Sequence, residues 1–208
     1  MYPALSTLHH RGDDRFWDRV KLGFRWLAAL AFPVLFFVTA EGGRILTTVY
    51  QSAFIAGVLP LQILVWGQGL DFFCPFAGHV LYVLEKQKKV IIVTGASVAT
   101  NVAVNLILIP LFGIIGAACA MVISLGVMLG GYLWALHGQV KVTDFFRSIA
   151  GPLAVATVTA PLIWVMKPFV PFVVNGLIYV TVYLAVLFSA RVIRFSDLKL
   201  FSSDSASP

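Results

Sequence analysis

The stretch "NVAVNLILIPLFGIIGAACAMVIS", residues 101–124, holds two apolar runs with a proline and a glycine between them. A helix needs about 20 apolar residues to cross a hydrocarbon core of roughly 30 Å, and each run reaches that length when its flanks are included. Pro110 favours the end of a helix, and Gly113 favours a tight turn. The stretch therefore predicts two transmembrane helices joined by a short, uncharged extracytoplasmic hairpin.

The rest of the chain has the same character, because 60% of its 208 residues are apolar and 12% are charged, with a mean hydropathy of +0.92. Such values are typical of integral membrane proteins. We therefore predict an all-α fold, a polytopic membrane helix bundle. The second span is long for a bilayer and contains Pro60 and Pro75, which predicts one kinked helix. The six predicted spans are residues 24–49, 52–84, 90–109, 113–136, 149–166 and 169–190.

The 15 lysines and arginines are unevenly distributed, since all except Arg44 and Lys167 lie before or at the start of the first span, or follow the second, fourth or sixth span. Basic residues favour the cytoplasmic side of a membrane, so we predict that both termini are cytoplasmic. An alternative treats the basic start and the apolar run up to Ala40 as a cleaved signal peptide, but apolar residues resume at Ile45. The predicted division is a cytoplasmic segment at 1–23, a six-helix membrane domain at 24–194 and a disordered cytoplasmic tail at 195–208.

Residues for catalysis or metal binding are sparse. The sequence has no glycine-rich phosphate loop, no HExxH and no GxSxG, so we predict no catalytic residues, no cofactor and no nucleic-acid partner. Cys74 and Cys119 lie inside apolar runs, which favours a packing role. His9 and His10 are adjacent, but no further ligands stand at suitable spacing, so we predict no metal site.

Polar residues at membrane depth are costly and usually face the protein interior or water. Gln68, Asp71 and His79 share one helical face, and Asn101 and Asn105 form a second polar stripe on the next predicted helix. All five are candidates for a substrate or ion path. The alternative is interhelical hydrogen bonding, which we favour for the asparagines but not for Asp71, because an ionisable group is an expensive way to join helices.

Two further groups have a structural interpretation. Glu41 and Arg44, three residues apart near the predicted outer boundary, favour an ion pair over a diphosphate site. Small residues at four-residue spacing predict close helix packing, with a moving interface as the alternative. These packing residues are Gly113, Gly116, Ala120, Ser124, Gly126 and Gly130.

The order "VYQSAFIAGVLPLQIL", a long helix ending in "LEKQKK" and the stretch at 101–124 resembles the C-terminal domain of polysaccharide-biosynthesis membrane proteins. These belong to the multidrug, oligosaccharidyl-lipid and polysaccharide exporter superfamily, which includes O-antigen and lipid II flippases. The resemblance covers about residues 24–138, and Gln51 departs from it where many relatives have glycine. Its most specific part is Asn105, Pro110, Gly113, Gly116, Ala117 and Ala118.

The resemblance implies an alternating-access flippase, not an enzyme. It would move undecaprenyl-diphosphate-linked oligosaccharide across the bacterial cytoplasmic (inner) membrane, driven by an ion gradient or the membrane potential. Relatives build their cavity between two lobes, and this chain is similar to the closing part of the second lobe. The implied partner is a separately encoded first lobe or a second copy of the chain.

Two other hypotheses stay open at this point. In the first hypothesis, the chain is a non-transporting remnant or an assembly partner. In the second, it is an intramembrane glycosyl- or acyl-transferase with Asp71 and His79 as acid and base. The two helical turns between these residues disfavour the second hypothesis, because both groups must reach one substrate atom.

Overall fold

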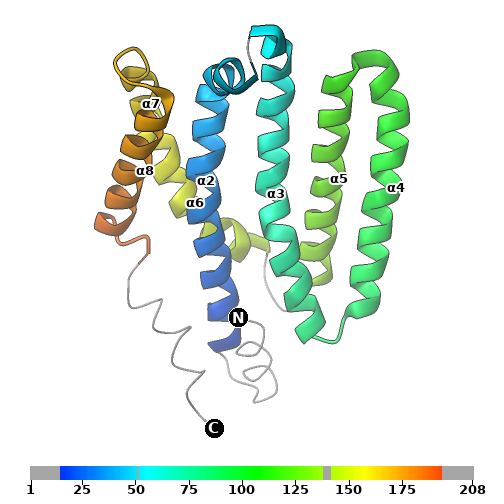
Figure 1. Cartoon of the computed structure of the whole chain (residues 1–208). Helices are drawn as coiled ribbons and strands as arrows, with labels where there is room; N and C mark the ends of the chain where they lie inside the picture. The colour runs from blue at the N-terminus through cyan, green and yellow to red at the C-terminus, as the bar shows by residue number, and fades with distance from the viewer. Residues whose placement is uncertain (1–14, 51, 138–141, 194–208) are drawn as a thin grey trace.

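The computed structural model describes residues 15–50, 52–137 and 142–193, which form helices and the turns between them. Six helices are long and apolar enough to cross a membrane, as the sequence predicted. A 3-10 helix, η1 (Ser52–Gly57), leads into the second span, and α7 (Pro161–Met166) completes the fifth. The main helices are α2 (Arg15–Tyr50), α3 (Val58–Val83), α4 (Gln87–Phe112), α5 (Ile114–Ala135), α6 (Val142–Thr159) and α8 (Phe172–Ser189), as Figure 1 shows.

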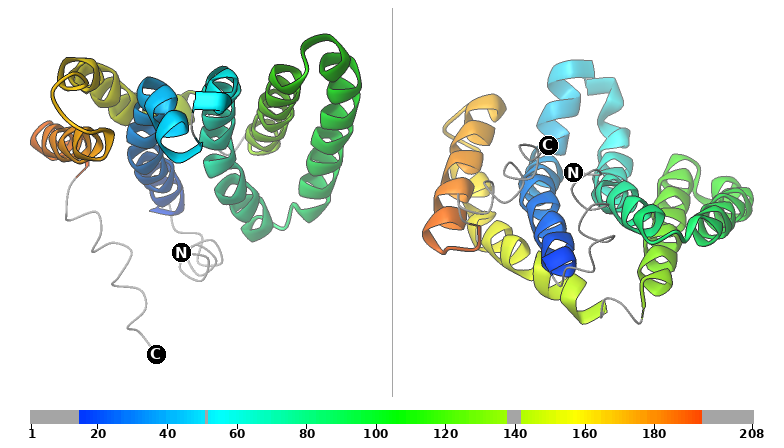
Figure 2. Two further views of the ribbon diagram at one scale, coloured as in Figure 1. Left: turned by 45° about the horizontal axis from the view of Figure 1, so that its top comes forward. Right: turned by 90° about the horizontal axis from the view of Figure 1, so that it is seen from below.

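Successive spans run in opposite directions, so the Arg15 end of α2 and the Ser189 end of α8 lie at the same end of the bundle (Figure 1). The view from below in Figure 2 shows α4 at one edge, α8 at the opposite edge, and α2 and α3 between them. Helix α3 packs mainly against α5 and α2, and α2 packs about equally against α6 and α3. The placement of the two chain ends in the cytoplasm stays a prediction.

Helix α2 begins at Arg15, nine residues before the predicted first span. The reason is the apolar series Phe16, Val20 and Phe24, whose spacing puts all three on one helical face, and all three are buried. Charged residues between these positions lower the average hydropathy of the segment, so the sequence did not indicate a membrane helix there. Part of the predicted 1–23 segment is therefore the first turns of a packed helix, and residues 1–14 lie outside the described residues, as does the predicted tail.

The second span is one helix, as predicted, but its two prolines have different roles. Pro60 lies in the first turn of α3, where a missing N–H costs no helical bond, so it does not bend the helix. Pro75 lies inside α3. Three other spans also contain an internal proline, and each such proline removes one ladder hydrogen bond and favours a bend. These are Pro33 in α2, Pro110 in α4 and Pro152 in α6.

The hairpin between α4 and α5 is tighter than the sequence predicted. Helix α4 continues through Pro110 to Phe112, because a proline near the last turn removes a single ladder bond and the surrounding residues keep theirs. Gly113 alone forms the turn, with φ of 55° and ψ of −129°. This conformation is accessible to glycine and strained for other residues, so the glycine is required by the backbone.

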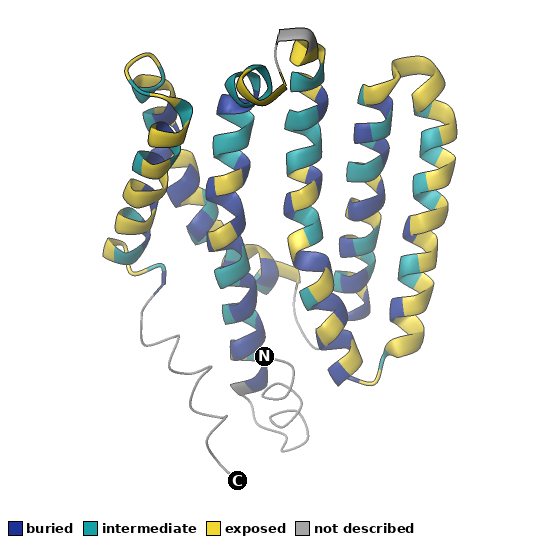
Figure 3. Ribbon diagram, viewed as in Figure 1, coloured by how far each residue is buried: buried dark blue, intermediate teal, exposed yellow. Residues whose placement is uncertain are grey.

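The apolar core lies toward the end of the bundle at which α2 begins (Figure 3). At its centre are three phenylalanine rings from three spans: Phe24, Phe73 and Phe145 have centroids 5.0 to 6.3 Å apart. Such edge-to-face and tilted contacts are favourable for aromatic pairs. Helix α4, at one edge of the bundle, is the least buried of the spanning helices.

Candidate functional site

Helix α3 separates two pockets of different chemistry. Consecutive residues of a helix are about 100° apart around its axis, so Asp71 and Phe73 point to roughly opposite sides. Asp71 lines a polar pocket between α3, α4 and α5, whereas Phe73 lines an apolar cavity between α2, α3, α5 and α6. One helix therefore presents a polar and an apolar surface to two different spaces.

The polar pocket has a volume of about 260 Å³. It contains the Asp71 carboxyl and the His79 imidazole, both candidates from the sequence, together with the hydroxyl groups of Tyr82, Thr94 and Tyr132. The Thr94 and Tyr132 hydroxyl oxygens lie 2.8 Å apart and so connect α4 with α5. These groups provide hydrogen-bond donors and acceptors together, which suits a polar ligand better than an apolar chain.

Asp71 is half-buried and accepts a hydrogen bond from the exposed side chain of Gln68, with 3.2 Å between Nε2 and Oδ2. Pro75 has no N–H to offer the backbone carbonyl of Asp71, so this carbonyl lacks its usual ladder bond. His79 lies one turn beyond Pro75, with its Nδ1 2.5 Å from the Pro75 carbonyl oxygen. Asp71 and His79 thus share a pocket while standing about 12 Å apart along the helix axis.

Neither asparagine lines one of the two pockets, and Asn101 connects α4 with α5. Asn105 donates to Asn101 at 3.0 Å, and Asn101 donates to the Ser124 hydroxyl of α5, also at 3.0 Å. Ser97 of α4 donates to the Ser124 backbone carbonyl at 2.6 Å. The bonds from Ser97 and Asn101 join α4 to α5, which supports interhelical hydrogen bonding for Asn101, whereas Asn105 bonds to Asn101 within α4 and both stay candidates for the substrate path.

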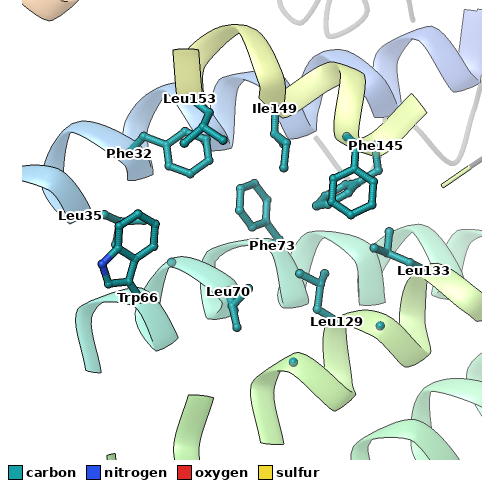
Figure 4. Close-up of a pocket in the computed structure, with 14 residues that line it drawn as sticks. Phe32, Leu35, Trp66, Leu70, Phe73, Leu129, Leu133, Phe145, Ile149 and Leu153 are labelled. Atoms are coloured by element: carbon teal, nitrogen blue, oxygen red, sulfur yellow. The ribbon is translucent and has the colours of Figure 1, made fainter. Parts of the chain in front are cut away.

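The apolar cavity has a volume of about 370 Å³, and sequence reasoning did not find it. Figure 4 shows Leu35 and Trp66 at one end and Leu133 and Phe145 at the other. Its walls come from four helices, so no local sequence pattern marks it. A space of this kind suits an apolar chain. The lining residues are Phe32, Leu35, Trp66, Gly69, Leu70, Phe73, Gly126, Leu129, Gly130, Leu133, Phe145, Phe146, Ile149 and Leu153.

The predicted packing face is only partly a helix contact. A Cβ on Gly116 would clash with the Leu108 carbonyl of α4, and both Ala120 and Ser124 are buried. Gly126 and Gly130 differ, since the position of a Cβ on either has no heavy atom of another helix within 4 Å. Gly126 is two residues beyond Ser124 and hence about 200° around the helix, so these two glycines line the apolar cavity.

Glu41 forms a buried cluster near the end of α2. It is 0% exposed; its Oε1 accepts a hydrogen bond from Asn175 Nδ2 at 2.7 Å and lies 3.4 Å from Arg44 Nη1. Lys167 Nζ lies 4.0 Å from Oε2. Arg44 also donates to the backbone carbonyls of Lys167 and Val170, at 2.9 and 3.0 Å. The Arg44 guanidinium is therefore already hydrogen-bonded to the segment between α7 and α8. This geometry supports an ion pair over a diphosphate site.

Groups of three or more His, Cys, Asp or Glu residues that could hold a metal ion are absent from the described part of the chain. His9 and His10 lie outside it.

Comparison with known families gives one match. The family described as lipid II flippase MurJ matches residues 1–188, a range that contains α2 to α7 and nearly all of α8. No match was found among curated proteins or among solved structures.

Proposed function

The chain belongs to the lipid II flippase MurJ family, and from this premise we propose that it forms six helices of a transporter that turns a lipid-linked precursor across the membrane. Members of this family are transporters and not enzymes. The observation that carries the proposal is the pair of pockets on opposite faces of α3, one apolar and one polar.

A polyprenyl-linked precursor combines a long apolar chain with a polar headgroup. The apolar cavity suits a section of the chain, and the polar pocket suits part of the headgroup. Asp71 would repel a diphosphate, so in this arrangement the polar pocket holds hydroxyl, amide or amine groups of the headgroup. The diphosphate would lie elsewhere along the path.

The substrate we propose first is lipid II, because that is the substrate that the family description names. The undecaprenyl-diphosphate-linked oligosaccharide implied by the sequence resemblance, for polysaccharide or O-antigen synthesis, is the second candidate. Both share the apolar chain and differ in the headgroup, so the contacts of the polar pocket would distinguish them.

We further propose that a second helical lobe covers the polar face of α3 in the bacterial inner membrane. Gln68 and His79 are exposed on the surface of this chain at membrane depth. Polar side chains that face lipid are costly, so a partner that encloses them is favoured. A separately encoded lobe fits this need, and a second copy of the chain is the alternative.

Reconstitution in vesicles tests the proposal. The chain is purified from its native membrane, with whatever lobe accompanies it, and offered fluorescent lipid II or a fluorescent lipid-linked O-antigen unit. Chemical quenching from outside then measures how much lipid has changed leaflet. Transfer of chemically unchanged lipid II supports the proposal, and a covalently altered product would support a transferase. Transfer of neither lipid by the intact complex would contradict the proposal and favour a non-transporting remnant.

A further inference from the structure

Five buried side-chain polar atoms have no hydrogen-bond partner among the described residues, and all five belong to α2 and α8. Four of them are Oε2 of Glu41, Oδ1 of Asn175 and the hydroxyl groups of Tyr179 and Tyr183. The fifth is the indole nitrogen of Trp26, about 22 Å from Glu41 along α2. The mechanism of transport proposed above uses none of these atoms.

The first four residues form what we call the polar column. Asn175, Tyr179 and Tyr183 are four residues apart on the buried face of α8 and extend about 12 Å along its axis. All three are 0% exposed, and the two tyrosine rings have centroids 6.3 Å apart. Glu41 joins the column at its Asn175 end through the 2.7 Å hydrogen bond. The column therefore extends from the Glu41 cluster into the interior of the bundle.

Protein groups near the column do not complete its hydrogen bonds. Both N–H groups of Asn175 are used, one by Glu41 and one by the Ile163 carbonyl, so its oxygen alone lacks a partner. The Thr159 hydroxyl interacts with Tyr179, but it donates its own proton to the Val155 carbonyl at 2.8 Å and so does not complete the hydrogen bonds of the Tyr179 hydroxyl group. Buried polar groups without a hydrogen-bond partner destabilise the fold, and the hydrocarbon of a membrane offers no donors or acceptors in place of the missing partner.

The charges around the column decide which ligand fits. Glu41 contributes one negative charge, and both Arg44 and Lys167 already lie within 4.0 Å of it, so a further cation would be repelled. An anion in the column would lie beside the Glu41 carboxylate, while Arg44 and Lys167 are already bound by that carboxylate and by backbone carbonyls. The column needs donors for two oxygen acceptors and a partner for each hydroxyl group, and water provides both from one small molecule.

We propose that the polar column binds a file of buried water molecules, which connects the Glu41 cluster with the hydroxyl groups of Tyr179 and Tyr183. Water is a neutral ligand with two donors and two acceptor positions, and buried waters usually make about three hydrogen bonds to such groups. The file gives the interior between α2 and α8 an aqueous path that is separate from the polar pocket and the apolar cavity described above.

Radiolytic hydroxyl-radical labelling of the intact protein in lipid nanodiscs tests this directly, since bound water generates the radical beside the side chain that it contacts. We expect Tyr179 and Tyr183 to be labelled although both are inaccessible to bulk solvent. Phe24 is a matched control, because it is equally buried in a purely apolar cluster. Labelling of the tyrosines no faster than of Phe24 would overturn the proposal.

Thermal unfolding of Tyr179→Phe and Tyr183→Phe gives a second, independent result. If water satisfies the hydroxyl groups, each variant loses hydrogen bonds and its Tm falls or stays within about 2 °C of the parent value. The control is Tyr132→Phe, whose hydroxyl has a protein partner in Thr94 and whose loss should lower the Tm. A rise of about 2–4 °C for either column variant would show that the hydroxyl had no partner, and would overturn the proposal.

Discussion

Removal of the buried carboxylate at Glu41 should destabilise the bundle strongly. Breaking a buried ion pair by deleting one partner typically costs about 3–5 kcal/mol. Here Arg44 and Lys167 are about one third exposed and keep their bonds to backbone carbonyls, which places the cost near the lower limit. Asn175 is fully buried and loses its 2.7 Å acceptor, which contributes about 1–3 kcal/mol of that cost.

For Glu41→Ala we therefore expect a loss of about 3 kcal/mol. A loss of 1 kcal/mol lowers the Tm of a chain of this size by about 2–4 °C, so the expected decrease is about 6–12 °C. Glu41→Gln keeps the shape and an oxygen acceptor for Asn175 but loses the charge, so a smaller decrease of about 2–4 °C is expected. The measurement is thermal unfolding in detergent micelles, followed by circular dichroism.

The matched control is Asp18→Ala, which also removes an acid from an (i, i+3) ion pair on α2, but from a side chain that is 79% exposed. Surface pairs of this kind contribute little, so its Tm should stay within about 2 °C of the parent value. A decrease of less than about 2 °C for Glu41→Ala would refute the assignment of a buried cluster. Equal decreases for the Ala and Gln variants would refute the division between charge and shape.

Four further predictions concern transport and the backbone. Asp71→Asn should insert normally and slow lipid flipping, because it keeps the hydrogen-bonding shape and loses the charge; normal flipping at normal protein level would make Asp71 structural. Gly130→Leu should leave the Tm unchanged and slow flipping, since Gly130 lines the apolar cavity and a Cβ there meets no neighbouring atom; unaffected flipping would argue against a chain in that cavity. With the native cysteines replaced, Leu111→Cys should react with an impermeant thiol reagent in intact cells and Lys89→Cys should not. Labelling of Lys89→Cys alone would show that the topology is the reverse of the predicted one. Gly113→Ala should cost about 1–3 kcal/mol in unfolding experiments because of its positive φ, and an unchanged Tm would show that the turn adopts another conformation.

The number of spans could be predicted because hydrocarbon thickness fixes how many apolar residues a helix needs. Helix ends were less predictable. Pro110 alone favours the end of a helix, yet α4 continues past it to Phe112. The proline removes one ladder hydrogen bond, and this loss is less costly than leaving the backbone polar groups of the next two residues without helical partners. The early start of α2 depends on Phe16 and Val20, whose apolar partners come from other parts of the bundle.

The polar stripe on α3 was predictable because Asp71 and His79 lie on the same helix, where spacing alone sets their direction. The Glu41 cluster was visible only in part. Arg44 is three residues away and therefore predictable, whereas Asn175 and Lys167 arrive from more than 120 residues further along the chain. The apolar cavity was not predictable at all, since four helices contribute to it and its residues do not differ from those that face lipid.

The internal prolines of three spans stand beside residues that line the apolar cavity. Pro33 adjoins Phe32, Pro152 adjoins Leu153, and Pro75 follows Phe73 by two residues. A helix bends more easily at a proline because no ladder bond has to break there. The fourth wall, α5, has Gly126 and Gly130 at the cavity, and glycine likewise loosens a helix. Each wall thus has a residue near the cavity at which bending is less costly, so we expect changes in the width of the cavity to come from bending of its walls.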